Sequence, residues 1–297
     1  MKLENEEWLV VVEPMDRSQR RFDHAGTVHQ VIRKNGGCCY LTRECLEKGG
    51  YSMGVGICSE FCASAPIGYQ EAGAGEYYLK PGVGKFKKPR AGVFHKAENG
   101  SGTGDDSETG NTYGGELPEL EPEEYELCIG DNQVTFWGGS RLDTGYGYYL
   151  EKSISLVKNR VIIVCQLRNI GGRPFWVEEY SHNFFSFNFE PVSEDYRLDT
   201  QEMGMERFLW SKDKGLYEGQ WKQRPKSYEY SLFHAATGRK IVERGDFPPL
   251  KFKLWQDLHC FCPECFIGIG LEPGMEKRWK RVFEFFCRLS RVNAKKV

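Results

Sequence analysis

Hydrophobic and polar residues along this chain alternate over short runs that are separated by turn-forming residues. Runs of this kind, rich in β-branched and aromatic residues, predict β-strands with one buried face. The pattern predicts strands at Trp8 to Val12, Val28 to Arg33, Tyr125 to Ile129, Gln133 to Trp137, Tyr146 to Val157, Arg160 to Arg168, Arg207 to Trp210, Tyr228 to His234, Arg239 to Glu243, Leu250 to Trp255, Phe266 to Ile269 and Trp279 to Cys287.

Two tight connections and one long run refine this pattern. Gly130-Asp131-Asn132 and Lys158-Asn159 join neighbouring runs as short hairpin turns would. The longest run, Pro174 to Phe189, would extend about 50 Å at ~3.3 Å per residue, so we expect a bend or bulge within it. Helical patterns are nearly absent, and the best candidate, Arg43 to Lys48, is only one or two turns long.

Many strands and few short helices predict an all-β protein built as a large antiparallel sandwich or barrel. We expect one domain over residues 1-297, because domains of this class reach this size and the sequence shows no internal repeat. Residues 97-115 contain Gly, Ser and Asp with almost nothing apolar, which is typical of a mobile surface loop. Strand patterns resume soon after this segment, which favours a loop insertion over a domain boundary.

Charge and apolar content narrow the range of partners. The chain has 40 Lys and Arg against 42 Asp and Glu, a formal net charge of −2. Nucleic-acid-binding proteins usually show a basic excess, so we expect no nucleic-acid partner. No apolar run reaches the roughly 18–20 residues of a membrane helix, so we expect no membrane partner either. The only apolar stretch near the start, Trp8 to Val12, follows acidic residues and does not form a signal peptide.

The chain contains 11 Cys, an odd number. Without an export signal, reduced thiols in a cytoplasmic protein are a better interpretation than a disulfide scaffold. Cys260, Cys262 and Cys265 are spaced closely enough to suggest a Zn or Cu(I) site. On a strand, however, Cys260 and Cys262 share a face and Cys265 does not. Small apolar core residues are therefore the favoured interpretation, with no metal bound.

His182 lies in a stretch, Glu178 to Asn188, that combines this histidine with amides and several aromatic rings. On a strand, Tyr180, His182, Phe184 and Ser186 would share one face. An imidazole titrates near neutrality and can protonate a substrate oxygen. A hydrogen-bonded core histidine explains the same pattern equally well.

Glu264 is a carboxylate flanked by Cys262-Pro263 and Cys265-Phe266. Burying a carboxylate without a partner is costly. An apolar setting is also how a general base is brought toward neutral pH, which makes Glu264 a candidate base. The simpler alternative is an ion pair between Glu264 and an Arg or Lys.

Arg17, Arg20 and Arg21 precede Gly26. A guanidinium group can hold several hydroxyls or a carboxylate, and Arg21 is the candidate for that role. A solvated turn explains Arg17 and Arg20. Tryptophans are spread along the strand-rich part of the chain; such rings stack on sugars when they are exposed in a cleft, but most of them must belong to the core.

Several short motifs follow one another in a characteristic order. Asn169-Ile170-Gly171-Gly172-Arg173-Pro174-Phe175 leads into Tyr180-Ser181-His182-Asn183-Phe184-Phe185, and the pair of strands before it spans Tyr149 to Asn169. Glu264 precedes Leu271-Glu272-Pro273-Gly274-Met275-Glu276 and the last predicted strand. This series resembles the galactose mutarotase-like (aldose 1-epimerase) superfamily. There, an Asn-x-Gly-x-x-Pro strand end leads to an active-site histidine, and a catalytic glutamate precedes a Leu-x-Pro-Gly-Glu turn.

The resemblance extends to shorter matches with an uncharacterised branch of that superfamily, at Ser18 to Gly26, Glu60-Phe61 and Pro66 to Tyr69. It implies a β-supersandwich and aldose 1-epimerase activity, the interconversion of sugar anomers by acid/base ring opening. By resemblance, Glu264 is the base and His182 the acid. We expect the two groups to face each other across a space the size of a hexose.

The resemblance also implies the ligand and its contacts. The partner is a small-molecule sugar or sugar phosphate, and the reaction needs no metal or organic cofactor. Arg21, and less directly Glu60, would hydrogen-bond sugar hydroxyls. Trp255 or Phe184 would supply the surface on which the sugar stacks.

The sequence departs from the family in two places. The His-Gly-Gly segment that supplies a second active-site histidine in typical aldose epimerases has no counterpart here, and His182 is followed by Asn-Phe-Phe. The alternative function is therefore a non-catalytic carbohydrate-binding protein that uses the same cleft. A sugar phosphate would need a basic cluster at the rim, for which Lys85 to Arg90 is the candidate, although a solvated loop is the commoner explanation of such a run.

Overall fold

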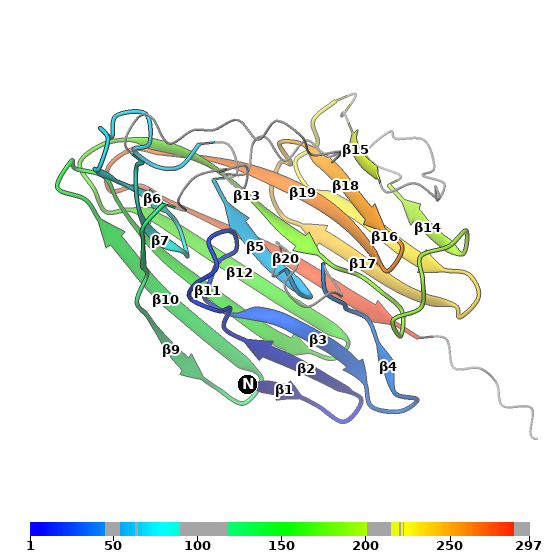
Figure 1. Ribbon diagram of the computed structural model, residues 1–297. Coiled ribbons are helices and arrows are strands. Elements are labelled where there is room, and N and C mark those ends of the chain that lie inside the picture. The colour runs from blue at the N-terminus through cyan, green and yellow to red at the C-terminus, as the bar shows by residue number, and fades with distance from the viewer. Residues whose placement is uncertain are drawn as a thin grey trace, which may run out of the picture.

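The computed structural model describes residues 1–44, 54–62, 65–89, 118–200, 215–219, 221 and 223–287. Strands dominate these residues, and no helix occurs among them (Figure 1). The few short helices that we expected are therefore not found in this part of the chain. Arg43, the first residue of the helical candidate, forms an isolated β-bridge with Val55, and residues 45–48 lie outside the described ranges. The loop expected at 97–115 and the strand expected at 207–210 lie outside them as well.

The first of two large sheets contains nine strands, and every pairing in it is antiparallel. In spatial order its strands are β1 (Lys2–Glu4), β2 (Trp8–Glu13), β3 (Thr27–Arg33), β5 (Ile57–Phe61), β13 (Phe175–Asn183), β19 (Cys260–Leu271), β18 (Phe252–Asp257) and β15 (Gly215–Gly219), with β4 (Cys38–Cys39) paired to β3. Strands from the two ends of the chain, β5 and β19, thus lie on either side of β13.

The second large sheet contains eight strands and is also antiparallel throughout. Its order is β14 (Tyr196–Asp199), β16 (Tyr228–His234), β17 (Arg239–Gly245), β20 (Glu276–Phe286), β12 (Arg160–Asn169), β11 (Gly147–Val157), β10 (Gln133–Arg141) and β9 (Tyr125–Ile129). A small third sheet consists of β6 (Tyr77–Lys80), β7 (Gly84–Lys87) and β8 (Leu120–Pro122).

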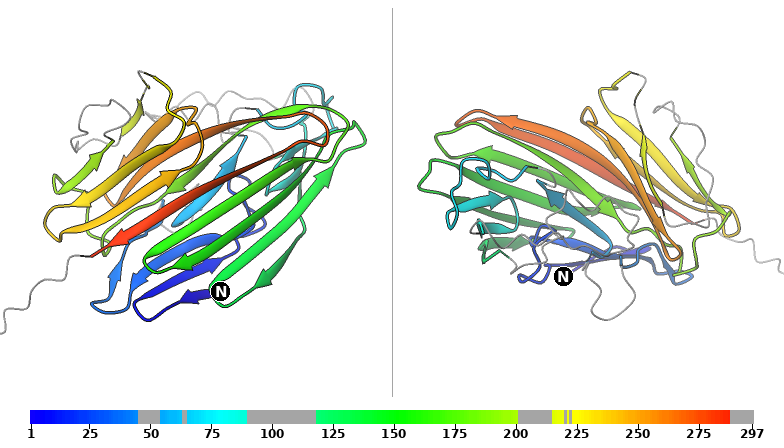
Figure 2. Two further views of the ribbon diagram at one scale, coloured as in Figure 1. Left: turned by 180° about the vertical axis from the view of Figure 1, so that it is seen from behind. Right: turned by 45° about the horizontal axis from the view of Figure 1, so that its top comes forward.

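The two large sheets form stacked layers, which Figure 2 shows from behind and in a view with the top tilted forward. Side chains that alternate along each strand fill the space between the layers. On β12 of the second sheet, Val161, Ile163 and Leu167 are buried, and on β13 of the first sheet Phe175 and Val177 join the same core. Each fully buried side chain of this kind contributes about 1.5–3 kcal/mol. The expected all-β sandwich is confirmed.

Most expected strands are present, and the differences are local. The long run from Pro174 does not continue as one strand: β13 ends at Asn183, and beyond the bend Phe185 forms isolated bridges with Leu41 and Phe261. β19 begins at Cys260 rather than at Phe266, because the cysteine-rich segment continues the ladder to β18. No helix able to span a bilayer occurs in the described ranges.

Gly56 allows β5 to approach its neighbours closely. Its φ is +62°, and a Cβ at this position would lie 1.9 Å from the carbonyl oxygen of Val28. A larger residue would have to push β3 away, so this place requires glycine. The Gly56 carbonyl accepts a hydrogen bond from the backbone N–H of Phe184. This close approach places β5 between β3 and β13, and with it Glu60 beside the histidine-bearing strand.

Candidate functional site

The face of the first sheet that points away from the main core carries its own cluster of side chains. Its buried apolar members are Met15, Phe22, Cys58, Phe184, Cys260 and Cys262. Alternation along β19 explains the division, because Phe261 and Cys265 pack into the main core while Cys260 and Cys262 belong to this second cluster. The expectation that Cys265 points away from the other two thiols is confirmed, and it excludes a metal site formed by these three cysteines.

The register of three adjacent strands brings the candidate residues together. On one side of β13, Tyr180 pairs with Glu60 of β5; on the other side, Tyr180 pairs with Phe266 of β19. His182 lies two residues after Tyr180, and Glu264 lies two residues before Phe266, so both side chains fall on the same face as Tyr180 and Phe266. The side chains of Glu60, His182 and Glu264 therefore meet on one face of the sheet, although they lie far apart in the sequence.

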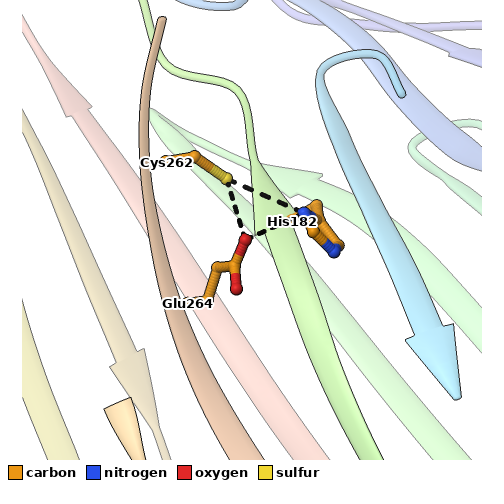
Figure 3. A group of neighbouring side chains, drawn as sticks. All are labelled: His182, Cys262 and Glu264. Carbon is orange, nitrogen blue, oxygen red and sulfur yellow. Dashed lines mark hydrogen bonds and ion pairs between the residues drawn. The ribbon is translucent and has the colours of Figure 1, made fainter. Parts of the chain in front are cut away.

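His182 and Glu264 contact each other directly (Figure 3). The distance from Nδ1 of His182 to Oε1 of Glu264 is 2.9 Å, and each side chain is only 5% exposed. The sequence-based expectation of a hexose-sized space between the two groups is wrong. The space between the two side chains is closed because they project from neighbouring strands of one sheet rather than from opposite walls of a cavity.

The other ring nitrogen of His182 faces a second carboxylate. Its Nε2 lies 3.1 Å from Oε2 of Glu60, which is completely buried. Glu60 also accepts hydrogen bonds from Arg21 Nε at 2.9 Å, from Lys80 Nζ at 3.2 Å and from the Tyr180 hydroxyl at 2.7 Å. Glu60 is thus a hub that fixes the imidazole, and it has no free surface for a sugar hydroxyl.

Electrostatic interactions favour the charged forms of His182 and Glu60. Burial by itself lowers the pKa of His182, but the attraction of Glu264 and the hydrogen bonds to Glu264 and Glu60 outweigh burial and raise that pKa above its usual value. Burial likewise opposes ionisation of Glu60, yet Lys80 and Arg21 hold the pKa of Glu60 well below its usual range. The imidazole is therefore protonated over more of the neutral range than an ordinary histidine.

Arg21 lies where the network reaches the surface. Its Nη1 contacts Oε1 of Glu44 at 3.0 Å, and its Nη2 lies 3.3 Å from Nε2 of His182. The side chains of Arg21, Glu44 and Lys80 are 20%, 14% and 11% exposed, more than those of His182 and Glu60. Arg21 is therefore the most exposed of these five side chains.

The two expected stacking residues differ in accessibility. The ring of Phe184 is completely buried and stacks on His182, with ring centroids 5.6 Å apart and an angle of 14° between the planes. Phe22 approaches the same imidazole edge-on at 5.1 Å. Trp255 is only partly buried and meets Phe184 edge-on. Phe184 therefore supports the imidazole from one side, and Trp255 is the ring of the two that retains exposed surface.

Sequence reasoning missed several neighbours of the pair. The sequence favours Cys262 as an apolar core residue, but in the structure its Sγ lies 3.5 Å from Oε1 of Glu264 and 3.9 Å from Nδ1 of His182. The i, i+2 spacing of Cys262 and Glu264 on a strand was the signal that could have joined them. Lys80 and Glu44 come from segments that carry no motif, so no sequence pattern could have linked them to Glu60 and Arg21.

The basic run from Lys85 is largely neutralised. Lys85 pairs with Glu121 at 3.6 Å and Lys87 with Glu119 at 3.0 Å. Lys88 donates to the backbone carbonyls of Tyr69 and Ala72, and Arg90 lies outside the described residues. These contacts give no support to the phosphate-binding role considered for this run.

The arrangement combines an acid and a base in contact, on a sheet face that also carries a guanidinium group. A protonated imidazole can give a proton to one oxygen while the adjacent carboxylate accepts a proton from another. Both groups are held by hydrogen bonds on a rigid sheet, so little reorganisation would accompany proton transfer. The chemistry available is proton exchange without a covalent intermediate.

Comparison with known proteins gives a consistent result for the fold. No family model and no curated protein matches this sequence. Among solved structures, a galactose mutarotase related enzyme from Lactobacillus acidophilus is similar, with 12% identity, a TM-score of 0.59, and coverage of 96% of this chain and 97% of that chain. A galactose mutarotase-like protein from Lactobacillus casei has 11% identity and a TM-score of 0.56, covering 96% and 99% of the two chains.

A GalM/aldose epimerase homologue from C. elegans is similar as well, with 11% identity, a TM-score of 0.54, and coverage of 94% of this chain and 99% of that chain. These likenesses extend over nearly the whole of each molecule, and at such low identity they define the fold alone. The likeness to these three structures shows that the chain has the galactose mutarotase-like fold.

Proposed function

We propose that this protein is an aldose 1-epimerase-like enzyme that interconverts sugar anomers by acid/base ring opening. The observation that carries the proposal is the direct contact between Nδ1 of His182 and Oε1 of Glu264, 2.9 Å apart on the outer face of the first sheet. An acid and a base in contact suit this reaction, because the two oxygens that exchange protons, O1 and the ring oxygen, are bonded to the same carbon. The groups that serve them therefore need to be neighbours rather than opposite walls of a sugar-sized space.

The reaction balances with these two groups alone. Glu264 takes the proton from the C1 hydroxyl while protonated His182 gives its proton to the ring oxygen, and the C1–O5 bond breaks to give the open-chain aldehyde. Rotation about C1–C2 presents the other face of the carbonyl. On closure the C5 hydroxyl returns a proton to His182, and Glu264 returns one to O1. Each properly placed group contributes about 10²–10⁴-fold to such a reaction.

The surrounding residues take supporting roles in this proposal. Arg21 hydrogen-bonds sugar hydroxyls at the rim, and the exposed part of Trp255 packs against the apolar face of the ring. Glu60 is a positioning residue: it holds the imidazole through Nε2 and favours its protonated form. Phe184 supports the imidazole from its buried face.

One observation favours a second candidate, a carbohydrate-binding protein without turnover. His182 and Glu264 already form an ion pair with each other, and a sugar would have to insert its anomeric centre between them. If that contact does not open, a sugar can bind to Arg21 and Trp255 at the rim without reaching the acid and the base.

Exchange of NMR signals between the two anomers separates these functions. The protein is added to a panel of anomerically pure aldoses and aldose phosphates, in the presence of a metal chelator. We expect accelerated exchange for at least one aldose, and a fall of about 10²–10⁴-fold in His182→Asn. Sugar binding without accelerated exchange in the wild type would instead establish the second candidate.

A further inference from the structure

We propose that His182, Cys262 and Glu264 form a binding site for a zinc ion. Among the described residues these three offer an imidazole nitrogen, a thiol sulfur and a carboxylate oxygen within 4.8 Å of one another (Figure 3). Nitrogen, sulfur and oxygen ligands of these types are the ones that zinc prefers. Three protein ligands leave the fourth tetrahedral position for water or for an oxygen of a ligand.

The distances between the ligand atoms match a tetrahedral ion closely. Zinc bonds of about 2.0–2.1 Å to N and O and about 2.3 Å to S imply separations of about 3.3 Å between N and O and about 3.6 Å between S and either of them. In the structure the corresponding distances are 2.9 Å, 3.5 Å and 3.9 Å. Movements of a few tenths of an ångström would therefore suffice to admit the ion.

The backbone fixes the three ligands in one place. Cys262 and Glu264 are two residues apart on β19, so they project from the same face, and His182 comes from the adjacent strand β13. The sequence suggested a thiol site with Cys260 and Cys265, but Cys265 faces the core between the sheets. In the folded protein, the possible ligands beside Cys262 are therefore a histidine and a glutamate instead of these two thiols.

The groups behind the ligands have the contacts that zinc sites typically show. A metal-bound histidine usually donates its other ring N–H to a carboxylate, and Nε2 of His182 lies 3.1 Å from Oε2 of Glu60. The backbone N–H of Asn183 donates to Sγ of Cys262 at 3.2 Å, which stabilises a thiolate. Both contacts leave Nδ1 and Sγ directed toward Glu264.

The charges also balance. A thiolate, a carboxylate and a neutral imidazole neutralise a divalent ion, so the thiol loses its proton to solvent on binding, and so does the imidazole wherever it is protonated. The guanidinium group of Arg21 contacts the Nε2 side of the imidazole and is paired with Glu60 and Glu44. The repulsion from Arg21 is thus offset by two carboxylates.

A bound zinc ion would occupy the nitrogen of His182 and the oxygen of Glu264 that face each other. This has a consequence that rests on the proposed function: zinc blocks the proton transfers, and the epimerase is inhibited by zinc and restored by a chelator. The zinc site itself does not depend on that function, because ion binding is measured without any sugar.

Cobalt(II) is the probe for the site, since it takes the place of zinc and its absorption reports a bound thiolate. We expect one Co²⁺ per chain with a thiolate-to-cobalt charge-transfer band, displaced by one equivalent of Zn²⁺. The band should be lost in Cys262→Ser and retained in Cys58→Ser. Cys58 is the matched control, because it is a buried thiol of the same cluster and pairs with His182 in the β5–β13 register.

Two further measurements keep the test decisive if Cys262→Ser does not fold. X-ray absorption of the zinc-loaded wild type should show one sulfur at about 2.3 Å together with N and O neighbours at about 2.0–2.1 Å. Zinc affinity, measured by competition with a chromophoric chelator, should fall about 10–100-fold in Glu60→Gln. Absence of stoichiometric binding to the wild type, absence of sulfur from the zinc shell, or a cobalt band that persists in folded Cys262→Ser would overturn the proposal.

Discussion

Strand β13 carries buried charged residues on both of its faces, and the two groups of charges around them differ in their partners and in their exposure. Between the sheets, Glu179 of β13 is held by Arg281 through two contacts of 2.7 Å and 3.0 Å. Glu243 completes this inner group and accepts hydrogen bonds from the hydroxyls of Tyr228 and Tyr230. Burial raises the pKa of Glu243 despite the proximity of Arg281.

The outer group of charges contains the candidate acid and base. Here the buried carboxylate, Glu60, has its pKa lowered rather than raised, because Lys80 and Arg21 overcome the effect of burial. Those two cations are partly exposed, whereas the Arg281 side chain of the inner group is only 3% exposed. The outer group therefore holds Glu60 in its ionised form and reaches the surface through Arg21 and Lys80.

Exposure distinguishes the buried charges that are candidates for function from those that only support the fold. A buried ion pair is weak evidence for either stability or activity by itself. The inner group is enclosed between the two sheets, and its ion pairs join one sheet to the other. The outer group also contains buried carboxylates paired with cations, but three of its members, Arg21, Glu44 and Lys80, are partly exposed.

Glu179→Gln should destabilise the fold more than any change in the outer group. It leaves Arg281 buried with Glu243 as its remaining carboxylate partner, and breaking a buried pair costs about 3–5 kcal/mol. Denaturant unfolding monitored by tryptophan fluorescence measures this loss. At a temperature where the variant is folded, any anomer-exchange activity should be retained; a large loss of activity with full stability would reverse the roles of the two groups.

Glu60→Gln should lower the pKa of His182, because it removes one of the two carboxylates that raise it. Proton NMR titration of the imidazole measures the change, and Glu264→Gln should shift the pKa in the same direction. Since the proposed acid must be protonated, the decline of the exchange rate at high pH should move to lower pH in Glu60→Gln. An unchanged His182 pKa would show that Glu60 does not act on the imidazole.

The raised pKa of His182 also determines whether the stability of the fold rises or falls with pH. The pKa of His182 is higher in the folded state than the ordinary value of about 6.5 in the unfolded chain. Its ion pairs therefore contribute stability that is fully present below about pH 6.5 and is lost as the pH rises through the folded-state pKa. In Glu60→Gln that contribution should be smaller.

Trp255→Leu should have the smallest effect. Loss of an aromatic stacking surface costs about 0.5–1.5 kcal/mol, which corresponds to an increase of about 2- to 10-fold in KM with little change in kcat. Steady-state measurements on the most responsive aldose test this, with Trp176→Leu as the control: Trp176 is exposed on the same face of the first sheet but is distant along β13. Equal effects of the two substitutions would refute a stacking role for Trp255.

Strands could be predicted from the sequence where only one face of the strand is buried. β11 and β12 begin and end within one residue of the expected bounds, because buried apolar positions alternate with more exposed ones along them. β5 was missed: its five residues are buried on both faces and include Ser59 and Glu60, so no alternation marks it. The end of β13 at Asn183 was not predictable either, because aromatic residues continue past the bend.

The candidate site was only partly predictable for the same reason. Family resemblance identified His182 and Glu264, but the distance between them follows from the register of β13 and β19, which no local pattern encodes. Glu60 was expected to meet a sugar and is instead a buried hub of hydrogen bonds. Phe184 was expected to offer a stacking surface and is covered completely. Both differences arise from burial on a face that the sequence pattern does not distinguish from the other.

The measurement that bears most directly on the outer group is anomer exchange in Glu264→Gln, followed by NMR on a protein whose fold and stability have been checked. The substitution keeps the size of the side chain and removes the base. We expect the exchange rate to fall about 10²–10⁴-fold relative to the wild type, while the unfolding free energy changes far less than in Glu179→Gln. A folded Glu264→Gln variant with the wild-type exchange rate would contradict the assignment of Glu264 and His182 as the base and acid of this protein.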